Sequence, residues 1–293
     1  MKIVRFILRD EVRLGVWVNE EVIDITEAKD DKYQSILDLS IDAKRKNRSI
    51  GDLLKEIITE NPQGLKRLPF KNLKIIKPID PPEVWGAGVT YKRSEEEREK
   101  ETGIKGIYSM VYRAKRPEIF FKATNHRCVG PDEEIGIRGD SNWSVPEPEL
   151  AFVLGFDGEI IGFTAGNDVS SRDIEAANPL YLSQAKIFEA CCAIGPSIVT
   201  VDEVGLEPKL NIECRIFRNG NMIFEGKTST EQMKRSISEI REYLLKYNPV
   251  PPGSVCLTGT GIIPPEDFSL IEGDIVEIEI EKIGILKNKV KLL

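Results

Sequence analysis

Apolar runs and alternating apolar and polar positions predict strands along much of the chain. Near the N-terminus, three such runs cover residues 2–8, 13–19 and 21–26, and Arg9-Asp10-Glu11 is the expected turn after the first. Residues 275–284 alternate apolar with acidic side chains, which is typical of a strand with one solvated face. Strands are therefore expected to dominate the fold.

Helical spacing is confined to a few segments. Residues 53–60 form a short apolar pattern that follows Asp52 near its start. A longer amphipathic pattern covers residues 230–247, and Thr230 is its expected N-cap. Before it, the Arg218-Asn219-Gly220 turn predicts a hairpin.

The chain is expected to divide into two parts. Residues 1–77 carry no catalytic constellation and are predicted to form a small N-terminal α/β domain, while residues 78–293 form the main domain. The small domain fits a packing role, and a lid or an oligomerisation arm is the alternative. A charge run over residues 95–100 fits either a solvated loop or a lid over a site.

Two acidic residues open the most informative stretch. Glu147 and Glu149 precede an apolar run over residues 150–154, and a second run over residues 160–165 ends near Asp168. Residues i and i+2 of a strand point to one face, so the two glutamates converge, and strand pairing would add Asp168. Three carboxylates suit a hard divalent cation, Mg²⁺ or Mn²⁺ with Ca²⁺ also possible. A solvated strand edge is the alternative.

Composition narrows the classes of function. The 293 residues are 41% hydrophobic and 30% charged, with a net charge of −7 and a pI of about 5.2, so neither nucleic acid nor an anionic membrane is favoured as a partner. No apolar run suggests a membrane span or a signal peptide, and a cytoplasmic location is expected. The five cysteines are expected to be reduced core residues. His126 is the only histidine, so any mechanism that needs two histidines is excluded.

These motifs together resemble the fumarylacetoacetate hydrolase superfamily. Its pattern is E-x-E, then strand-turn-strand, then N-D-x-S-x-R-D, which residues 167–173 match here. The resemblance covers about Pro78 to the C-terminus. It implies a mostly β fold of the α+β class, a mixed β-roll or sandwich with a few helices around a central site. It also implies a variable N-terminal region and a homodimer or homotetramer.

The resemblance also implies roles for individual residues. Lys186 matches the active-site lysine, and Glu118, in the R-P-x-x-F-x-K stretch, is an acid/base candidate. We expect substrate contacts from five further residues: Tyr91, Arg93, Ser94, Lys122 and Thr260. Lys122 shares a strand face with Glu118 and is expected to clamp a carboxylate.

One departure from the family pattern changes the expected reaction. Ser94 stands where the family has the histidine that activates water for C–C hydrolysis, and an unaided serine is no base near neutral pH. The favoured outcome is loss of water from a 2-oxo acid, a 2-keto-3-deoxypentonate going to 2,5-dioxopentanoate. The alternatives are C–C hydrolysis of acylpyruvates or fumarylacetoacetate, and isomerisation or decarboxylation of dienoates. A non-catalytic binding relative is a further alternative.

Overall fold

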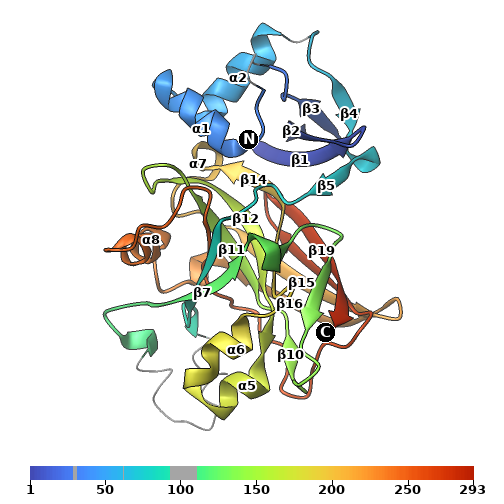
Figure 1. Cartoon of the computed structure of the whole chain (residues 1–293), viewed down its shortest axis with the longest axis vertical. Coiled ribbons are helices and arrows are strands. Elements are labelled where there is room, and N and C mark those ends of the chain that lie inside the picture. The colour runs from blue at the N-terminus through green and yellow to red at the C-terminus, as the bar shows by residue number, and fades with distance from the viewer. Residues whose placement is uncertain (29–31, 62, 93–110) are drawn as a thin grey trace.

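The computed structural model describes residues 1–28, 32–61, 63–92 and 111–293 (Figure 1). The candidate substrate residues Arg93 and Ser94, and the charge run over 95–100, lie outside this part of the chain.

A mixed sheet of twelve strands runs through the molecule. Ten strands follow the spatial order β4-β3-β2-β1-β14-β12-β11-β17-β6-β7, while β5 pairs with β1 and β8 with β14. The strands are β1 (Lys2–Leu8), β2 (Glu11–Val18), β3 (Glu21–Asp24), β4 (Arg67–Pro69), β5 (Lys74–Ile76), β6 (Glu83–Gly88), β7 (Glu118–Thr124), β8 (Cys128–Val129), β11 (Pro148–Leu154), β12 (Ile160–Asp168), β14 (Cys192–Thr200) and β17 (Val255–Leu257).

A second sheet packs against the middle of the first. Its order is β16-β15-β18-β19-β9, and β15, β18 and β19 approach β11, β12 and β14. The bounds are β9 (Glu134–Ile137), β15 (Asn211–Arg218), β16 (Asn221–Ser229), β18 (Ile275–Ile280) and β19 (Gly284–Leu292), and a separate pair joins β10 (Ser144–Val145) to β13 (Ser170–Ser171). Every residue of β11, β12 and β14 is buried, because elements cover both faces of these strands.

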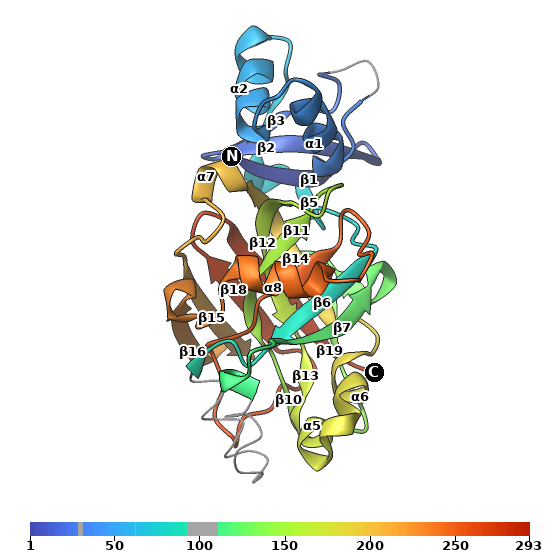
Figure 2. The same cartoon turned by 90° about the vertical axis from the view of Figure 1, so that its left-hand side faces the viewer.

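The N-terminal part is tied to the rest by strand pairing. Strands β1–β5 form it together with α1 (Ile36–Arg45) and α2 (Ile50–Glu60), and it lies at one end of the molecule in both views (Figures 1 and 2). At the junction Lys2 pairs with Val199 and Ile3 with Ile198, so one sheet continues from this part into the remainder. The division at residue 77 remains a prediction.

The other helices are short and flank the two sheets. They are α5 (Arg172–Ala177), α6 (Leu182–Lys186), α7 (Val201–Val204) and α8 (Ile237–Leu245), with 3₁₀ turns over Phe70–Asn72, Asn125–Arg127, Pro179–Tyr181 and Thr230–Gln232. Figure 2 shows α8 in front of the main sheet and α5 and α6 at the end away from the N-terminal part.

One helix prediction needs correction, and one helix was not predicted. The helix expected over 230–247 begins only at Ile237, with Ser236 as its N-cap. Thr230 cannot cap it, because its hydroxyl accepts from the Leu210 N–H at 2.9 Å and donates to the Pro208 carbonyl at 2.6 Å. The helix α1 was not predicted at all, although Ser35 caps it with a capping box.

The cysteine prediction is confirmed. All five cysteines are free thiols in the core, and burial raises the pKa of Cys214 to about 12. Among the described residues, no helix combines the length and the apolar character that crossing a membrane requires.

Candidate functional site

Three acidic side chains meet where β11 and β12 run side by side. Pro148 lies opposite Asn167, which sets Glu147 opposite Asp168, and the Asp168 N–H donates to the Glu147 carbonyl at 3.0 Å. Glu149 follows two residues later on the same face. One carboxylate oxygen from each of the three acidic residues lies within 4.8 Å of the others, and all three residues are buried. The expected strand pairing therefore brings the third carboxylate to the first two.

Two cations contact Glu147 and neutralise part of the charge of the cluster. The Lys186 ammonium, at the end of α6, lies 2.8 Å from Glu147 Oε2 and 2.9 Å from Asp168 Oδ2, and it donates to Ser170 Oγ at 2.6 Å. Arg172 Nε, at the start of α5, lies 3.2 Å from Glu147 Oε1. Ion pairs of this kind hold buried carboxylates in place, since an unpaired buried charge is strongly unfavourable.

Glu149 experiences the repulsion within the cluster. Burial, and then the charges of Asp168 and Glu147, raise the pKa of Glu149 well above the ordinary value. Lys186 and the Gly259 N–H, which donates to Glu149 Oε2 at 2.5 Å, act in the opposite direction without reversing the shift. The protonated form of Glu149 is therefore favoured by its buried position beside two other carboxylates.

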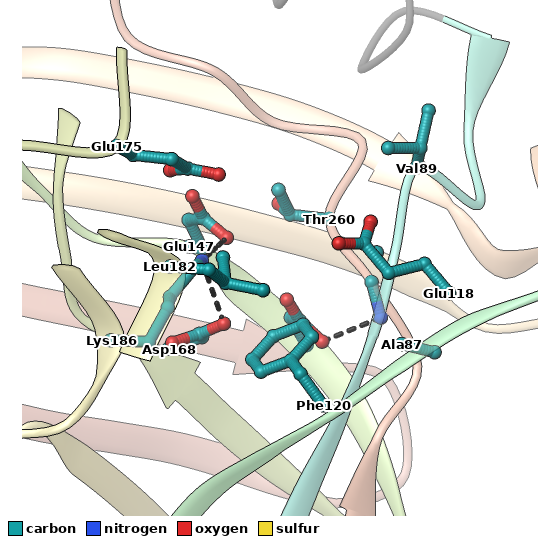
Figure 3. Close-up of a pocket in the computed structure, with 13 residues that line it drawn as sticks. Ala87, Val89, Glu118, Phe120, Glu147, Asp168, Glu175, Leu182, Lys186 and Thr260 are labelled. Atoms are coloured by element: carbon teal, nitrogen blue, oxygen red, sulfur yellow. Dashed lines mark hydrogen bonds and ion pairs between the residues drawn. The ribbon is translucent and has the colours of Figure 1, made fainter. Parts of the chain in front are cut away.

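The three carboxylates line a small pocket (Figure 3). Glu118 from β7 and Glu175 from α5 point into it from opposite sides. The Phe120 ring lies beside Lys186, whose ammonium is 5.4 Å from the ring centroid. The lining is completed by Ala87, Gly88, Val89, Leu182, Gly259 and Thr260. The pocket is small, polar and rich in carboxylates, as recognition of a small polar ligand requires.

Two glycines let the backbone pass close to these groups. A Cβ atom on Gly88 would lie 2.1 Å from Glu118 Oε2. Gly259 has a φ of +96°, and a Cβ there would lie 2.0 Å from Thr90 Oγ1. Gly259 needs this left-handed conformation to aim its N–H at Glu149.

The remaining sequence candidates lie in different places. Thr260 lines the pocket, and its hydroxyl exchanges hydrogen bonds with the backbone of Ile262. Tyr91 is buried and does not line the pocket, and burial followed by the charge of Glu149 raises the pKa of its phenol. His126 is exposed beside Thr124 and also lies outside the pocket.

Lys122 does not line the pocket. It is fully buried, and its ammonium lies 2.6 Å from Asp168 Oδ1 as an ion pair outside hydrogen-bonding angles. It donates to the carbonyls of Val169 at 2.8 Å and Lys186 at 2.6 Å. The carboxylate that Lys122 clamps is therefore a side chain of this chain, and this placement argues against substrate contact.

The sequence analysis did not identify Arg172, Glu175 or the Gly259 N–H as parts of the site. Glu175 lies one helical turn after Arg172 on α5. Their i, i+3 spacing directs both side chains toward the cluster, and this can be predicted once a helix is assigned here. The Gly259 N–H contacts Glu149 from 110 residues away, and no local pattern carried that information.

The donor set fits a hard divalent cation. Three buried carboxylates offer oxygen ligands, and neither a thiol nor an imidazole lines the pocket among the described residues. Oxygen-only sites select Mg²⁺, Mn²⁺ or Ca²⁺ over Zn²⁺. A cation held there would favour the ionised form of Glu149 and so oppose the rise in its pKa that burial and the neighbouring carboxylates cause.

Comparison with known proteins identifies the family of the chain. Residues 83–291 match the family model described as fumarylacetoacetate (FAA) hydrolase C-terminal. The chain belongs to the FAA hydrolase family. The predicted resemblance and the mostly β fold are thereby confirmed.

Two archaeal relatives within the FAA hydrolase family are similar over most of their length. The chain is 50% identical over 231 residues to the 2-dehydro-3-deoxy-D-arabinonate dehydratase of Saccharolobus solfataricus, covering 78% of each protein. It is 51% identical over 213 residues to a probable 2-keto-3-deoxyxylonate dehydratase of Haloferax volcanii, covering 73% of each. A solved structure of 2-keto-3-deoxy-D-arabinonate dehydratase complexed with magnesium and 2,5-dioxopentanoate superimposes with a TM-score of 0.81 at 40% identity, covering 100% of this chain and 99% of that one.

Proposed function

We propose that this protein is a magnesium-dependent hydro-lyase that converts 2-keto-3-deoxy-D-arabinonate to 2,5-dioxopentanoate. The observation that carries the proposal is the buried cluster of Glu147, Glu149 and Asp168 with Lys186 beside it. The chain is also 50% identical over 231 residues to a dehydratase of that substrate. The polar, carboxylate-rich lining of the pocket suits a metal-bound 2-oxo acid.

The cation supplies one part of the chemistry. Mg²⁺ held by Glu147, Glu149 and Asp168 would act as a Lewis acid toward the 2-oxo acid head of the substrate, and so make the C3 protons more acidic. The side chains of this chain would then remove a C3 proton and assist departure of the C4 hydroxyl as water. The resulting C3–C4 double bond must next shift toward C5, with loss of a C5 proton and return of protons to C3 and C4, to give the C5 aldehyde of 2,5-dioxopentanoate.

Lys186 and Glu118 are the candidates for removing the C3 proton and assisting departure of the hydroxyl. The Lys186 ammonium sits beside two of the three carboxylates, next to where the substrate head would lie, and is suited to stabilise negative charge or move the C3 proton. Glu118 points into the pocket from β7, and Gly88 leaves room for its carboxylate. Protonated, Glu118 could donate to the leaving hydroxyl; ionised, it could serve as the base.

Several further residues are proposed to bind the substrate or to support the pocket wall. Thr260 lines the pocket, and Glu175 offers a carboxylate that accepts hydrogen bonds from hydroxyl groups. Arg93 and Ser94 remain proposed contacts to the substrate carboxylate and hydroxyls. Tyr91 is proposed only as support for the pocket wall, since it is buried behind it.

Hydrolysis of a C–C bond is less well supported. The single histidine of the chain, His126, is exposed and does not line the pocket, so no imidazole is available there to activate water. Dehydration requires no water nucleophile.

A coupled assay tests the proposal. Formation of 2,5-dioxopentanoate from 2-keto-3-deoxy-D-arabinonate is followed with Mg²⁺, after chelation, and after Mg²⁺ is restored. Turnover that disappears with the chelator and returns with Mg²⁺ is expected. Full activity in the chelator would remove the metal from the mechanism, and turnover of acylpyruvates alone would replace the dehydratase with a hydrolase.

The cellular location and the oligomeric state are also proposals. We infer a cytoplasmic protein that assembles as a homodimer or homotetramer, as the family resemblance implies. Light scattering on the purified full chain measures the assembly, and cell fractionation measures the location.

A further inference from the structure

Lys122 is a buried lysine outside the pocket lining whose ammonium lies against three groups of the protein. Its side chain has no solvent exposure, and its ammonium has three N–H groups. Two of them donate to the carbonyls of Val169 and Lys186, and Asp168 Oδ1 lies at 2.6 Å on the remaining side. Placing a lysine in the core is unfavourable unless such partners exist, so its presence needs a purpose beyond packing.

The partners of Lys122 belong to two parts of the site. Asp168 is a proposed metal ligand, and Val169 is the residue after it. The Lys186 carbonyl belongs to the last residue of α6, where helix carbonyls lack intrahelical partners. One ammonium therefore joins the end of β12, which carries Asp168, to the end of α6, which carries Lys186.

The orientation of Asp168 follows from this arrangement. Its Oδ1 faces Lys122 and its Oδ2 faces the Lys186 ammonium at 2.9 Å, so the carboxylate is held between two lysines. Without Lys122, the carboxylate could rotate about its side-chain torsions and the end of α6 would lose an anchor. Such outer contacts orient metal ligands in many sites.

We propose that Lys122 is a positioning residue that fixes Asp168 for the metal and Lys186 for proton transfer, relative to each other. This inference rests on the proposed function for the part that concerns Lys186. The part that concerns Asp168 requires only that the carboxylate cluster binds a divalent cation.

Mg²⁺ titration of the full chain by isothermal calorimetry, without substrate, tests the Asp168 part. Lys122→Met is expected to weaken Mg²⁺ binding about 10- to 100-fold, the usual effect of losing an outer contact to a metal ligand. The matched control is Arg13→Met, which removes another buried cation, 2.6 Å from Asp24 in the N-terminal part, and should leave Mg²⁺ affinity unchanged. Wild-type affinity in Lys122→Met would overturn the proposal.

A second pair of variants separates the positioning of Asp168 from a general effect of Lys122→Met on stability. In Asp168→Asn the partner charge is gone, so adding Lys122→Met should change the Mg²⁺ affinity no further. An equally large additional loss in the double variant would show that Lys122 acts through general stability, and would overturn the proposal.

Kinetics at saturating Mg²⁺ test the Lys186 part. Lys122→Met should keep the KM for 2-keto-3-deoxy-D-arabinonate within about threefold while kcat falls at least tenfold, because Lys186 is displaced but the substrate head still binds. Full recovery of kcat at saturating Mg²⁺ would overturn the link to Lys186. If the wild type does not dehydrate this substrate, the proposed function fails, and the calorimetry still decides whether Lys122 acts on Asp168.

Discussion

Glu149 gives the sharpest test of the carboxylate cluster, because its replacement should have opposite effects with and without metal. The perturbation is Glu149→Gln, which keeps the size of the side chain and an oxygen that can accept from the Gly259 N–H. Two like charges at the 4.8 Å limit of the cluster repel by about 3.5 kcal/mol at an effective dielectric constant of about 20. This exceeds the roughly 0.5–1.5 kcal/mol net contribution of a typical hydrogen bond. Metal-free Glu149→Gln should therefore be at least as stable as the wild type.

The pH dependence follows from the raised pKa of Glu149. Because its pKa in the folded protein lies above the unfolded value, its contribution is fully present below the unfolded pKa and is lost as the pH rises through the folded pKa. The metal-free wild type should thus lose stability relative to Glu149→Gln as the pH rises through that range. Mg²⁺ binding must release the proton from Glu149, so stabilisation by Mg²⁺ should grow with pH over the same interval.

The expected size of the metal effect can be calculated. Mg²⁺ at about 100 times its Kd adds about 2.7 kcal/mol to the free energy of unfolding. For 293 residues, an unfolding entropy of about 2.1 cal/mol/K per residue gives about 0.6 kcal/mol/K, so Tm should rise by about 4 °C. Differential scanning fluorimetry with and without Mg²⁺ measures this shift.

A control variant distinguishes the loss of Mg²⁺ binding at the carboxylate cluster from a general loss of stability. Asp24→Asn removes a different buried carboxylate, paired with Arg13 at 2.6 Å, and should lower Tm while keeping the full Mg²⁺ shift. Glu149→Gln should lose most of that shift. An unchanged Mg²⁺ shift in Glu149→Gln, or none in the wild type at millimolar Mg²⁺, would refute the assignment of these carboxylates to a metal.

Three further outcomes are expected. Lys186→Met should lower kcat by about 10²–10⁴-fold in the coupled assay while Mg²⁺ still raises Tm, because proton transfer is lost but the three carboxylates remain; near-normal kcat would contradict its role. Gly259→Ala should cost about 1–3 kcal/mol in urea denaturation and weaken Mg²⁺ binding, since alanine is strained at a φ of +96° and its Cβ would clash with Thr90; a neutral effect would contradict the need for glycine. The five thiols, including Cys214 with its pKa of about 12, should resist a thiol reagent at pH 8 until urea unfolds the chain, and rapid native labelling would disprove their burial.

Local patterns were enough for the centre of the site. Two glutamates at i and i+2 before an apolar run, followed by a turn and a second run, specify a hairpin in any fold, and the hairpin alone brings Glu147, Glu149 and Asp168 together. The strands of residues 2–8 and 275–280 were also predictable, because alternation and apolar runs are properties of short segments.

Sequence patterns gave wrong predictions where the partners of a side chain lie far away in the sequence. Thr230 looks like an N-cap, but its hydroxyl bonds with Pro208 and Leu210 instead, and the helix begins at Ile237. Lys122 lies on the predicted strand face, yet its direction toward Asp168 was set by how β7, β12 and α6 pack. Sequence spacing alone does not reveal such partners.

The sequence by itself determined the chemistry of this protein, which is three oxygen ligands, a lysine within an apolar stretch and a single histidine. The tertiary structure decided which groups reach the pocket: it placed Glu175 and the Gly259 N–H there, buried Tyr91 behind the wall, and kept His126 outside. The physical reason is the separation along the sequence between the residues that come into contact. Backbone geometry fixes neighbours a few residues apart, whereas contacts between distant segments depend on the order in which strands pair across the whole sheet.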